Sequence, residues 1–168
     1  MSLRPVVRCA GYSIRALEGI SIQYRIGYSP DPPSKGSRVF RIFLVDDSAE
    51  VRAALTTALE QRSNWVVVGE AYNGRHALET FLDHAPHLTL MDFLMPEMNG
   101  LEAARHLVSR YPTVLILMIT ADPSLQLETE ARKAGIRGVC AKSHLPHLFL
   151  AIEAVVSGGT YFSEDAVA

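Results

Sequence analysis

Short apolar runs alternate with amphipathic stretches along most of this chain. From Phe40 onward, runs rich in Val, Ile, Leu or Phe are separated by segments of about 10–15 residues with a helical spacing of apolar side chains. A continuous apolar run is typical of a parallel strand, because helices cover both faces of a parallel sheet. The pattern predicts strands at about 40–45, 65–70, 88–91, 113–119 and 137–140.

Helices are expected between these strands. Three are indicated by apolar side chains three or four positions apart, at 51–59, 77–82 and 101–108, and two more are expected near 123–134 and 146–157. Helix-breaking residues lie between the expected elements, among them Pro86, Pro112, Pro123, Pro146, Asn73-Gly74 and Gly135. Five βα units predict an α/β fold, a doubly wound five-stranded parallel sheet of flavodoxin-like order 2-1-3-4-5 with helices on both faces.

The first 38 residues differ from the rest of the chain. They have no sustained apolar period, and residues 28–37 are rich in Pro, Ser and Gly. We interpret residues 1–38 as a flexible basic extension or linker without stable structure; a transit peptide and an over-extended reading frame are the alternatives. The domain is expected at 39–160, followed at 161–168 by a short tail with no output domain.

Charge and composition narrow the function classes. Residues 1–38 carry a net charge of +4 and residues 39–168 a net charge of −6, so bulk charge does not favour a nucleic-acid-binding domain. The longest apolar run, 114–119, is far shorter than the roughly 20 residues that cross a bilayer. Cys9 and Cys140 lie far apart and outside any cluster with metal-ligand spacing. We therefore expect a cytoplasmic protein that contacts neither membrane nor nucleic acid directly.

Polar residues follow the expected strands where each one ends. Asp46 and Asp47 come after the first strand, Asp92 after the third, Thr120 after the fourth and Lys142 after the fifth. In open sheets of this order, ligands bind beyond the carboxyl ends of the strands. Five polar side chains are therefore expected to converge on one edge of the sheet.

The residue types at this edge indicate phosphoryl chemistry. Three neighbouring carboxylates repel one another unless a cation compensates them. Mg²⁺ suits such a site, because it keeps several waters and binds through one or two carboxylates plus phosphate. A carboxylate can also attack a phosphoryl group and form an acyl phosphate, while an ammonium, a hydroxyl and the metal neutralise the phosphoryl oxygens.

The segment from Leu90 to Gly100, LMDFLMPEMNG, resembles the phosphoacceptor loop of response-regulator receivers, with Pro96 four and Gly100 eight residues after Asp92. Together with the other polar strand ends, the resemblance covers about residues 40–157. It implies a CheY-like receiver of a two-component system, a switch rather than a metabolic enzyme. Such a receiver accepts a phosphoryl group from a sensor histidine kinase or a phosphotransfer protein and changes a protein–protein surface.

The resemblance also implies a role for each polar residue. Asp92 would be the phosphoacceptor, Lys142 would pair with the phosphoryl group, and Thr120 would move toward that group after transfer. The metal ligands would be Asp92, Asp46, Asp47 and the backbone carbonyl of Leu94. Leu94 and Asp122 also occupy positions whose side chains affect how fast the phosphoryl group is lost.

Two departures from the common receiver pattern leave the output open. Receivers usually carry an aromatic residue three positions before the lysine, where this chain has Val139. Ser143 and the segment 151–163 resemble receivers that precede a LuxR/NarL-type helix-turn-helix domain, yet the sequence stops at Ala168. Either an output domain lies outside this sequence or the protein acts alone, and a homodimer is compatible with both.

Two other functions are weighed against the phosphorylatable receiver. A pseudo-receiver would use the fold for dimerisation or docking without phosphorylation, which Val139 motivates. A phosphatase with an aspartyl nucleophile would need a second Asp two residues after Asp92, where this chain has Leu94.

Overall fold

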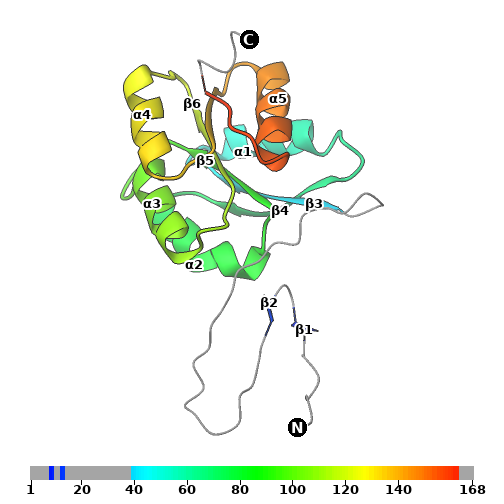
Figure 1. The fold of residues 1–168 in the computed structure, drawn as a ribbon. Helices are drawn as coiled ribbons and strands as arrows, with labels where there is room; N and C mark the ends of the chain where they lie inside the picture. The colour runs from blue at the N-terminus through cyan, green and yellow to red at the C-terminus, as the bar shows by residue number, and fades with distance from the viewer. Residues whose placement is uncertain (1–7, 10–11, 14–38, 163–168) are drawn as a thin grey trace, which may run out of the picture.

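Five parallel strands form the central sheet of the structure, a computed structural model that describes residues 8–9, 12–13 and 39–162 (Figure 1). The strands are β3 (Phe40–Val45), β4 (Trp65–Ala71), β5 (Leu88–Asp92), β6 (Ile116–Thr120) and β7 (Gly138–Ala141). Their order in the sheet is β4-β3-β5-β6-β7. In chain order of these five strands this is 2-1-3-4-5, so the predicted topology is confirmed.

One helix follows each of these strands. The helices are α1 (Ala49–Leu59), α2 (Gly74–His84), α3 (Gly100–Arg110), α4 (Leu125–Lys133) and α5 (Leu145–Val156). Local polar residues start the first four helices: the side chains of Ser48, Asn73, Asn99 and Ser124 each accept a backbone N–H from the first turn. The first turn of α5 instead contains a proline, whose fixed φ suits that position.

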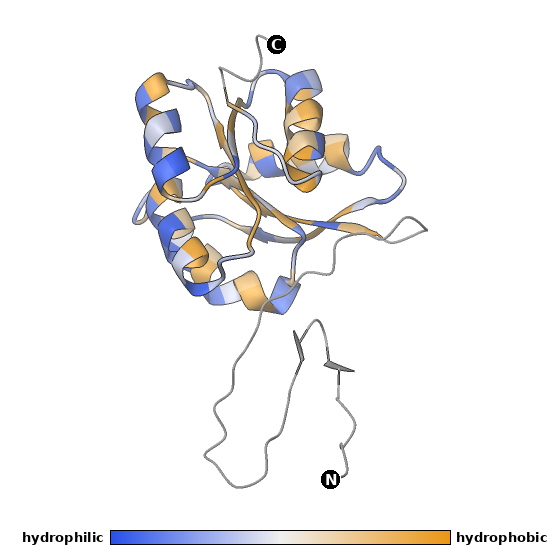
Figure 2. Ribbon diagram, in the orientation of Figure 1, coloured by the Kyte–Doolittle hydropathy of each residue, from blue (hydrophilic) through white to orange (hydrophobic). Residues whose placement is uncertain are grey.

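The two faces of the sheet bury separate apolar clusters. Along β3, Phe43 and Val45 belong to the cluster that α2, α3 and α4 cover, whereas Ile42 and Leu44 belong to the cluster under α1 and α5. This alternation follows from the two-residue period of a strand. In Figure 2 the strands of the sheet are coloured mostly as hydrophobic, whereas hydrophobic and hydrophilic residues alternate along the helices.

Two segments differ from the prediction or extend beyond it. The fourth strand of the sheet begins at Ile116, not near residue 113, because a turn precedes it in which the Val114 N–H donates to the Tyr111 carbonyl at 2.9 Å. After α5, Tyr161 forms an isolated parallel bridge with Gly138, and Phe162 is fully buried. The first two residues of the expected tail therefore pack against the domain.

Most of the amino-terminal 38 residues and all of 163–168 lie outside the described residues, and with them the predicted extension and the rest of the tail. Within that extension, β1 (Arg8–Cys9) and β2 (Tyr12–Ser13) form a two-stranded antiparallel pair. Among the helices that the structure describes, none is both long and apolar enough to cross a bilayer.

Candidate functional site

Three aspartates meet at the carboxyl edge of the sheet, as predicted. Asp92 is the last residue of β5, and Asp46 and Asp47 directly follow β3, its neighbour in the sheet. Each of the three offers a carboxylate oxygen within 4.8 Å of the others. Asp46 and Asp92 are buried, whereas Asp47 is exposed, so the cluster has a wall inside the protein and an opening toward solvent.

Lys142, which directly follows β7, forms ion pairs with two of these carboxylates. Its Nζ lies 2.7 Å from Asp46 Oδ2 and 2.9 Å from Asp92 Oδ2. Burial raises the pKa of Asp92, with the nearby charge of Asp46 acting in the same direction and Lys142 opposing both. Burial by itself would lower the pKa of Lys142, but the two carboxylates outweigh it and raise that pKa. The lysine is therefore firmly cationic, and Asp92 is held less acidic than a free aspartate.

The donor set fits a hard divalent cation. Asp46 Oδ1 accepts the Ser48 N–H at 3.0 Å, and the buried Oδ2 is in contact with the Lys142 ammonium at 2.7 Å. A buried carboxylate oxygen with unused lone pairs is costly. Three clustered carboxylates with one exposed member can bind Mg²⁺ while leaving part of its water shell in place.

Thr120 and Leu94 border the cluster. The Thr120 hydroxyl is buried and accepts the Asp122 N–H at 3.4 Å, and its carbonyl accepts the Lys142 N–H at 2.8 Å. The Leu94 N–H donates to Asp92 Oδ1 at 3.3 Å, while its side chain is 64% exposed. The structure thus links both residues to the acidic edge, and the role of the Leu94 carbonyl as a metal ligand stays a prediction.

The loop after Asp92 is held against the strand that it leaves. The Gly100 N–H donates to the Phe93 carbonyl at 3.0 Å, and the loop turns through Glu97, whose φ is 65°. A β-carbon at Gly100 would collide with the carbonyl oxygen of Asp92. This close approach is a physical reason for glycine eight residues after the acidic residue.

Arg52 is a residue that the sequence pattern did not single out. Its Nη1 donates to the Asp46 carbonyl at 2.8 Å, and its Nε pairs with Glu70 Oε2, also at 2.8 Å. Through this contact, a residue of α1 fixes the backbone at the start of the Asp46–Asp47 loop, which precedes that helix. A spacing of six residues from an aspartate matches no short motif, so only the fold reveals this contact.

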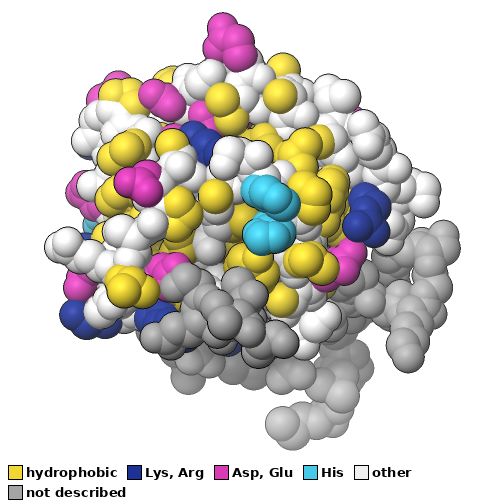
Figure 3. All heavy atoms as spheres, turned by 90° about the horizontal axis from the view of Figure 1, so that it is seen from above, with side chains coloured by type: hydrophobic (Ala, Val, Ile, Leu, Met, Phe, Trp, Pro, Cys, Tyr) yellow, Lys and Arg dark blue, Asp and Glu magenta, His cyan; other side chains and the backbone are white. Residues whose placement is uncertain are grey.

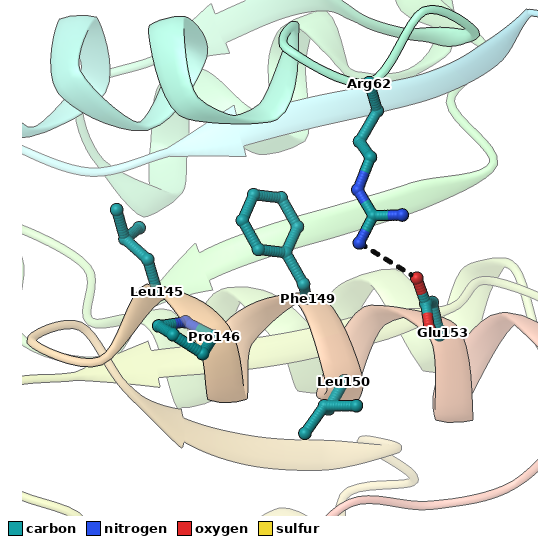
Figure 4. Close-up of a pocket in the computed structure, with 6 residues that line it drawn as sticks. All are labelled: Arg62, Leu145, Pro146, Phe149, Leu150 and Glu153. Atoms are coloured by element: carbon teal, nitrogen blue, oxygen red, sulfur yellow. Dashed lines mark ion pairs between the residues drawn. The ribbon is translucent and has the colours of Figure 1, made fainter.

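A shallow apolar groove lies apart from the acidic edge. It is lined by Arg62, Leu145, Pro146, Phe149, Leu150 and Glu153, and an ion pair of 3.2 Å joins Arg62 to Glu153 (Figure 4). His144 and His147, with rings 4.0 Å apart, flank it at the start of α5. Adjacent histidine side chains lie among hydrophobic ones on the face drawn in Figure 3. The groove does not offer the convergent carboxylates of the acidic edge, which remains the candidate site.

The comparisons with known proteins all point to the same family. The model of the response regulator receiver domain matches residues 42–153. The transcriptional activator protein ExaE of Pseudomonas putida is 34% identical over 124 residues, which are 73% of this chain and 58% of that protein. The chemotaxis protein CheY of Thermotoga maritima is 34% identical over 106 residues, 63% of this chain and 88% of its own length.

Solved structures agree with these relatives. The crystal structure of a two-component response regulator of the LuxR family from an Aurantimonas species has a TM-score of 0.72 at 32% identity, covering 76% of this chain and 91% of the other. The chain spans about three fifths of the length of several relatives that it matches, such as the response regulator UvrY of Escherichia coli, of which it covers 59%.

Proposed function

The chain belongs to the response-regulator receiver family of two-component systems, and from this premise we propose that Asp92 is its phosphoacceptor. Receivers are signalling switches and not metabolic enzymes, so the expected chemistry is one transfer per activation. The observation that carries the proposal is the pair of contacts from one lysine ammonium to Asp46 and Asp92, at 2.7 and 2.9 Å, beside the exposed Asp47. This arrangement supports the assignment of a nucleophile, a cation and a metal site to one edge of the sheet.

The reaction exchanges one bond to phosphorus for another. An Asp92 carboxylate oxygen attacks the phosphorus of a phosphohistidine, the new O–P bond makes an acyl phosphate, and the N–P bond to the donor imidazole breaks. Lys142 then pairs with a phosphoryl oxygen, and Thr120 donates its hydroxyl to another. Asp46, Asp47, Asp92 and the Leu94 carbonyl would hold Mg²⁺, which when bound neutralises charge on the phosphoryl oxygens.

Acetyl phosphate with Mg²⁺ tests the acceptor directly. Wild-type protein is expected to gain the mass of one phosphoryl group, and Asp92→Asn is expected to gain none, because an amide is not a nucleophile under these conditions. Intact-mass spectrometry measures both. A wild-type protein that stays unmodified, or an Asp92→Asn variant modified to the wild-type extent, would contradict the proposal.

Removal of the exposed metal ligand tests the second part of the site. Asp47→Ala is expected to weaken Mg²⁺ binding by at least about tenfold, since a carboxylate that contacts a divalent ion is lost without any buried partner being exposed. Isothermal titration with MgCl₂ measures the change, and Asp83→Ala, an aspartate on α2 away from the acidic edge, is the matched control. Equal Mg²⁺ affinity in Asp47→Ala and wild type would remove this residue from the metal site.

The two other functions find less support. A pseudo-receiver would not need a buried aspartate paired with a lysine beside an open carboxylate, whereas this chain has both. A phosphatase of the aspartyl-nucleophile type would need an acid at position 94, where the exposed leucine cannot transfer a proton. The receiver that is phosphorylated on Asp92 remains the proposal.

The partners follow from the family. We propose a sensor histidine kinase or a phosphotransfer protein as the phosphoryl donor, a homodimer as one assembly, and the cytoplasm as the compartment. Because several relatives are longer transcriptional regulators, DNA binding would belong to a further domain and not to residues 39–162. Size-exclusion chromatography with light scattering, with and without acetyl phosphate, measures the assembly state.

A further inference from the structure

Phe162 lies beyond the last helix and yet belongs to the core. Its side chain is 1% exposed and is part of the cluster between the sheet and α2, α3 and α4, together with Val139, Leu127 and Ala131. The guanidinium carbon of Arg132, on α4, lies 3.8 Å from the centre of its ring. A buried aromatic ring with a cation over its face is a strong anchor. The segment of residues 160–162, here called the edge segment, is therefore fixed at its end.

Backbone pairing places this ring beside Val139. Tyr161 pairs in parallel with Gly138, the Val139 N–H donates to the Tyr161 carbonyl, and the Tyr161 N–H donates to the Arg137 carbonyl, both at 2.9 Å. One residue further in the same register, Phe162 lies next to Val139, on the face that both share. In Figure 1 the red chain after α5 turns back and runs toward the upper end of the sheet.

Gly138 makes the close approach possible. A β-carbon there would lie 2.6 Å from the Tyr161 carbonyl oxygen. The edge segment thus covers the outer edge of β7, which would otherwise present unpaired N–H and C=O groups. The outer edge of β7 is therefore accessible to another strand only when the edge segment is not docked on it.

A short stretch of chain connects the candidate site to the helix that packs with Phe162. The Thr120 carbonyl accepts the Lys142 N–H at 2.8 Å, and four residues after Thr120 the Ser124 side chain caps α4. Leu127 and Ala131 of α4 lie in the same cluster as Phe162. A shift of Thr120 toward Asp92 would pull the short connection between β6 and α4 and so displace α4. Because the interior is close-packed, the side chains that pack against α4 would have to rearrange.

We propose that Phe162 replaces the aromatic side chain missing from β7, so that the edge segment is docked when Asp92 is unmodified and released when it is phosphorylated. The inference rests on the proposed phosphoacceptor function. Release exposes the N–H of Val139 and the C=O of Arg137, a sheet edge with which another strand can pair. Because linkage is reciprocal, weakening the docked state strengthens binding of a phosphoryl mimic at Asp92.

Hydrogen exchange on the full chain, with and without Mg²⁺ and beryllofluoride, tests the proposal. In wild type, beryllofluoride is expected to speed exchange of the Val139 and Tyr161 amides by at least about fivefold. Phe162→Ala is expected to exchange these amides rapidly in both conditions and to lower the beryllofluoride midpoint by about fivefold. Leu150→Ala, which truncates an exposed leucine of α5, is the control and should leave both quantities unchanged.

A merely structural anchor would change exchange but not the midpoint, so an unaltered midpoint in a folded Phe162→Ala variant would overturn the inference. Should that variant fail to fold, Gly138→Ala displaces the Tyr161 backbone with Phe162 intact and is expected to give the same shift. Fluorine NMR of the same samples separates the two proposals. Bound beryllofluoride with unchanged amide exchange overturns the release of the edge segment alone, whereas no bound beryllofluoride overturns the phosphoacceptor site as well.

Discussion

Replacing Lys142 by Met is expected to slow phosphorylation by acetyl phosphate at least about 100-fold, the cost of removing one preorganised donor from a site where charge develops. The ammonium lies 2.9 Å from Asp92, and its own pKa is raised by the two carboxylates, so it is charged throughout the neutral range. Methionine keeps the aliphatic volume and removes the charge. Rates of phosphoryl incorporation at fixed Mg²⁺ measure the loss.

The same substitution is expected to make stability depend on pH in a specific way. Without Mg²⁺, Lys142→Met leaves two buried carboxylates uncompensated, which costs about 2 kcal/mol, less than the roughly 3–5 kcal/mol of a fully buried pair because the lysine side chain is 21% exposed. The folded-state pKa of Asp92 is raised above that of a free aspartate. Lys142 opposes that rise, so its removal raises the Asp92 pKa further in the variant. As pH falls through this raised pKa, Asp92 becomes neutral, the repulsion from Asp46 disappears, and the difference from wild type shrinks.

A matched lysine separates charge at the site from charge in general. Lys133 is 66% exposed and pairs with Glu130 on the surface of α4. Lys133→Met should change neither the phosphorylation rate nor the melting temperature by a measurable amount, since exposed pairs of this kind contribute at most about 0.5 kcal/mol. Equal rates for Lys142→Met and wild type would exclude the lysine from phosphoryl transfer.

Much of the site could be predicted from sequence because its residues follow the strands directly. Asp46, Asp92, Thr120 and Lys142 each stand at the end of an apolar run, and the ends of parallel strands meet at one edge once the strand order is known. Strand order in turn followed from five regular βα units. The prediction thus depended on local patterns whose spatial consequence is fixed by the fold.

Contacts between elements distant in sequence could not be predicted in the same way. Arg52 reaches the Asp46 carbonyl because α1 packs beside the loop that precedes it, and no residue pattern encodes that angle. Phe162 fell within the expected short tail, since two adjacent aromatic residues shortly after Gly158-Gly159 have no period to identify either one as core. Its burial follows from the parallel bridge between Tyr161 and Gly138, which only the arrangement of the chain in space reveals.

Gly100→Ala is expected to reduce both stability and phosphorylation, because the added methyl group would collide with the carbonyl oxygen of Asp92. The backbone of Asp92 is also paired with Ile119 of β6, so the Asp92 carbonyl cannot move freely away from the added methyl group. Overpacking of this kind costs about 3 kcal/mol. If Asp92 is the phosphoacceptor that we propose, its displacement by even about 1 Å would slow transfer by about 100-fold.

A glycine in open space provides the control for this substitution. Gly158 has a φ of 90°, and a β-carbon added there would meet no atom within 4 Å, so Gly158→Ala carries only the backbone cost of about 1 kcal/mol. Chemical denaturation and acetyl phosphate labelling of both variants compare the two effects. Gly158→Ala should lose some stability and retain the wild-type rate, whereas Gly100→Ala should lose both. If Gly100→Ala were phosphorylated at the wild-type rate, the loop glycine would not position Asp92, and its place eight residues after the acceptor would need another physical reason.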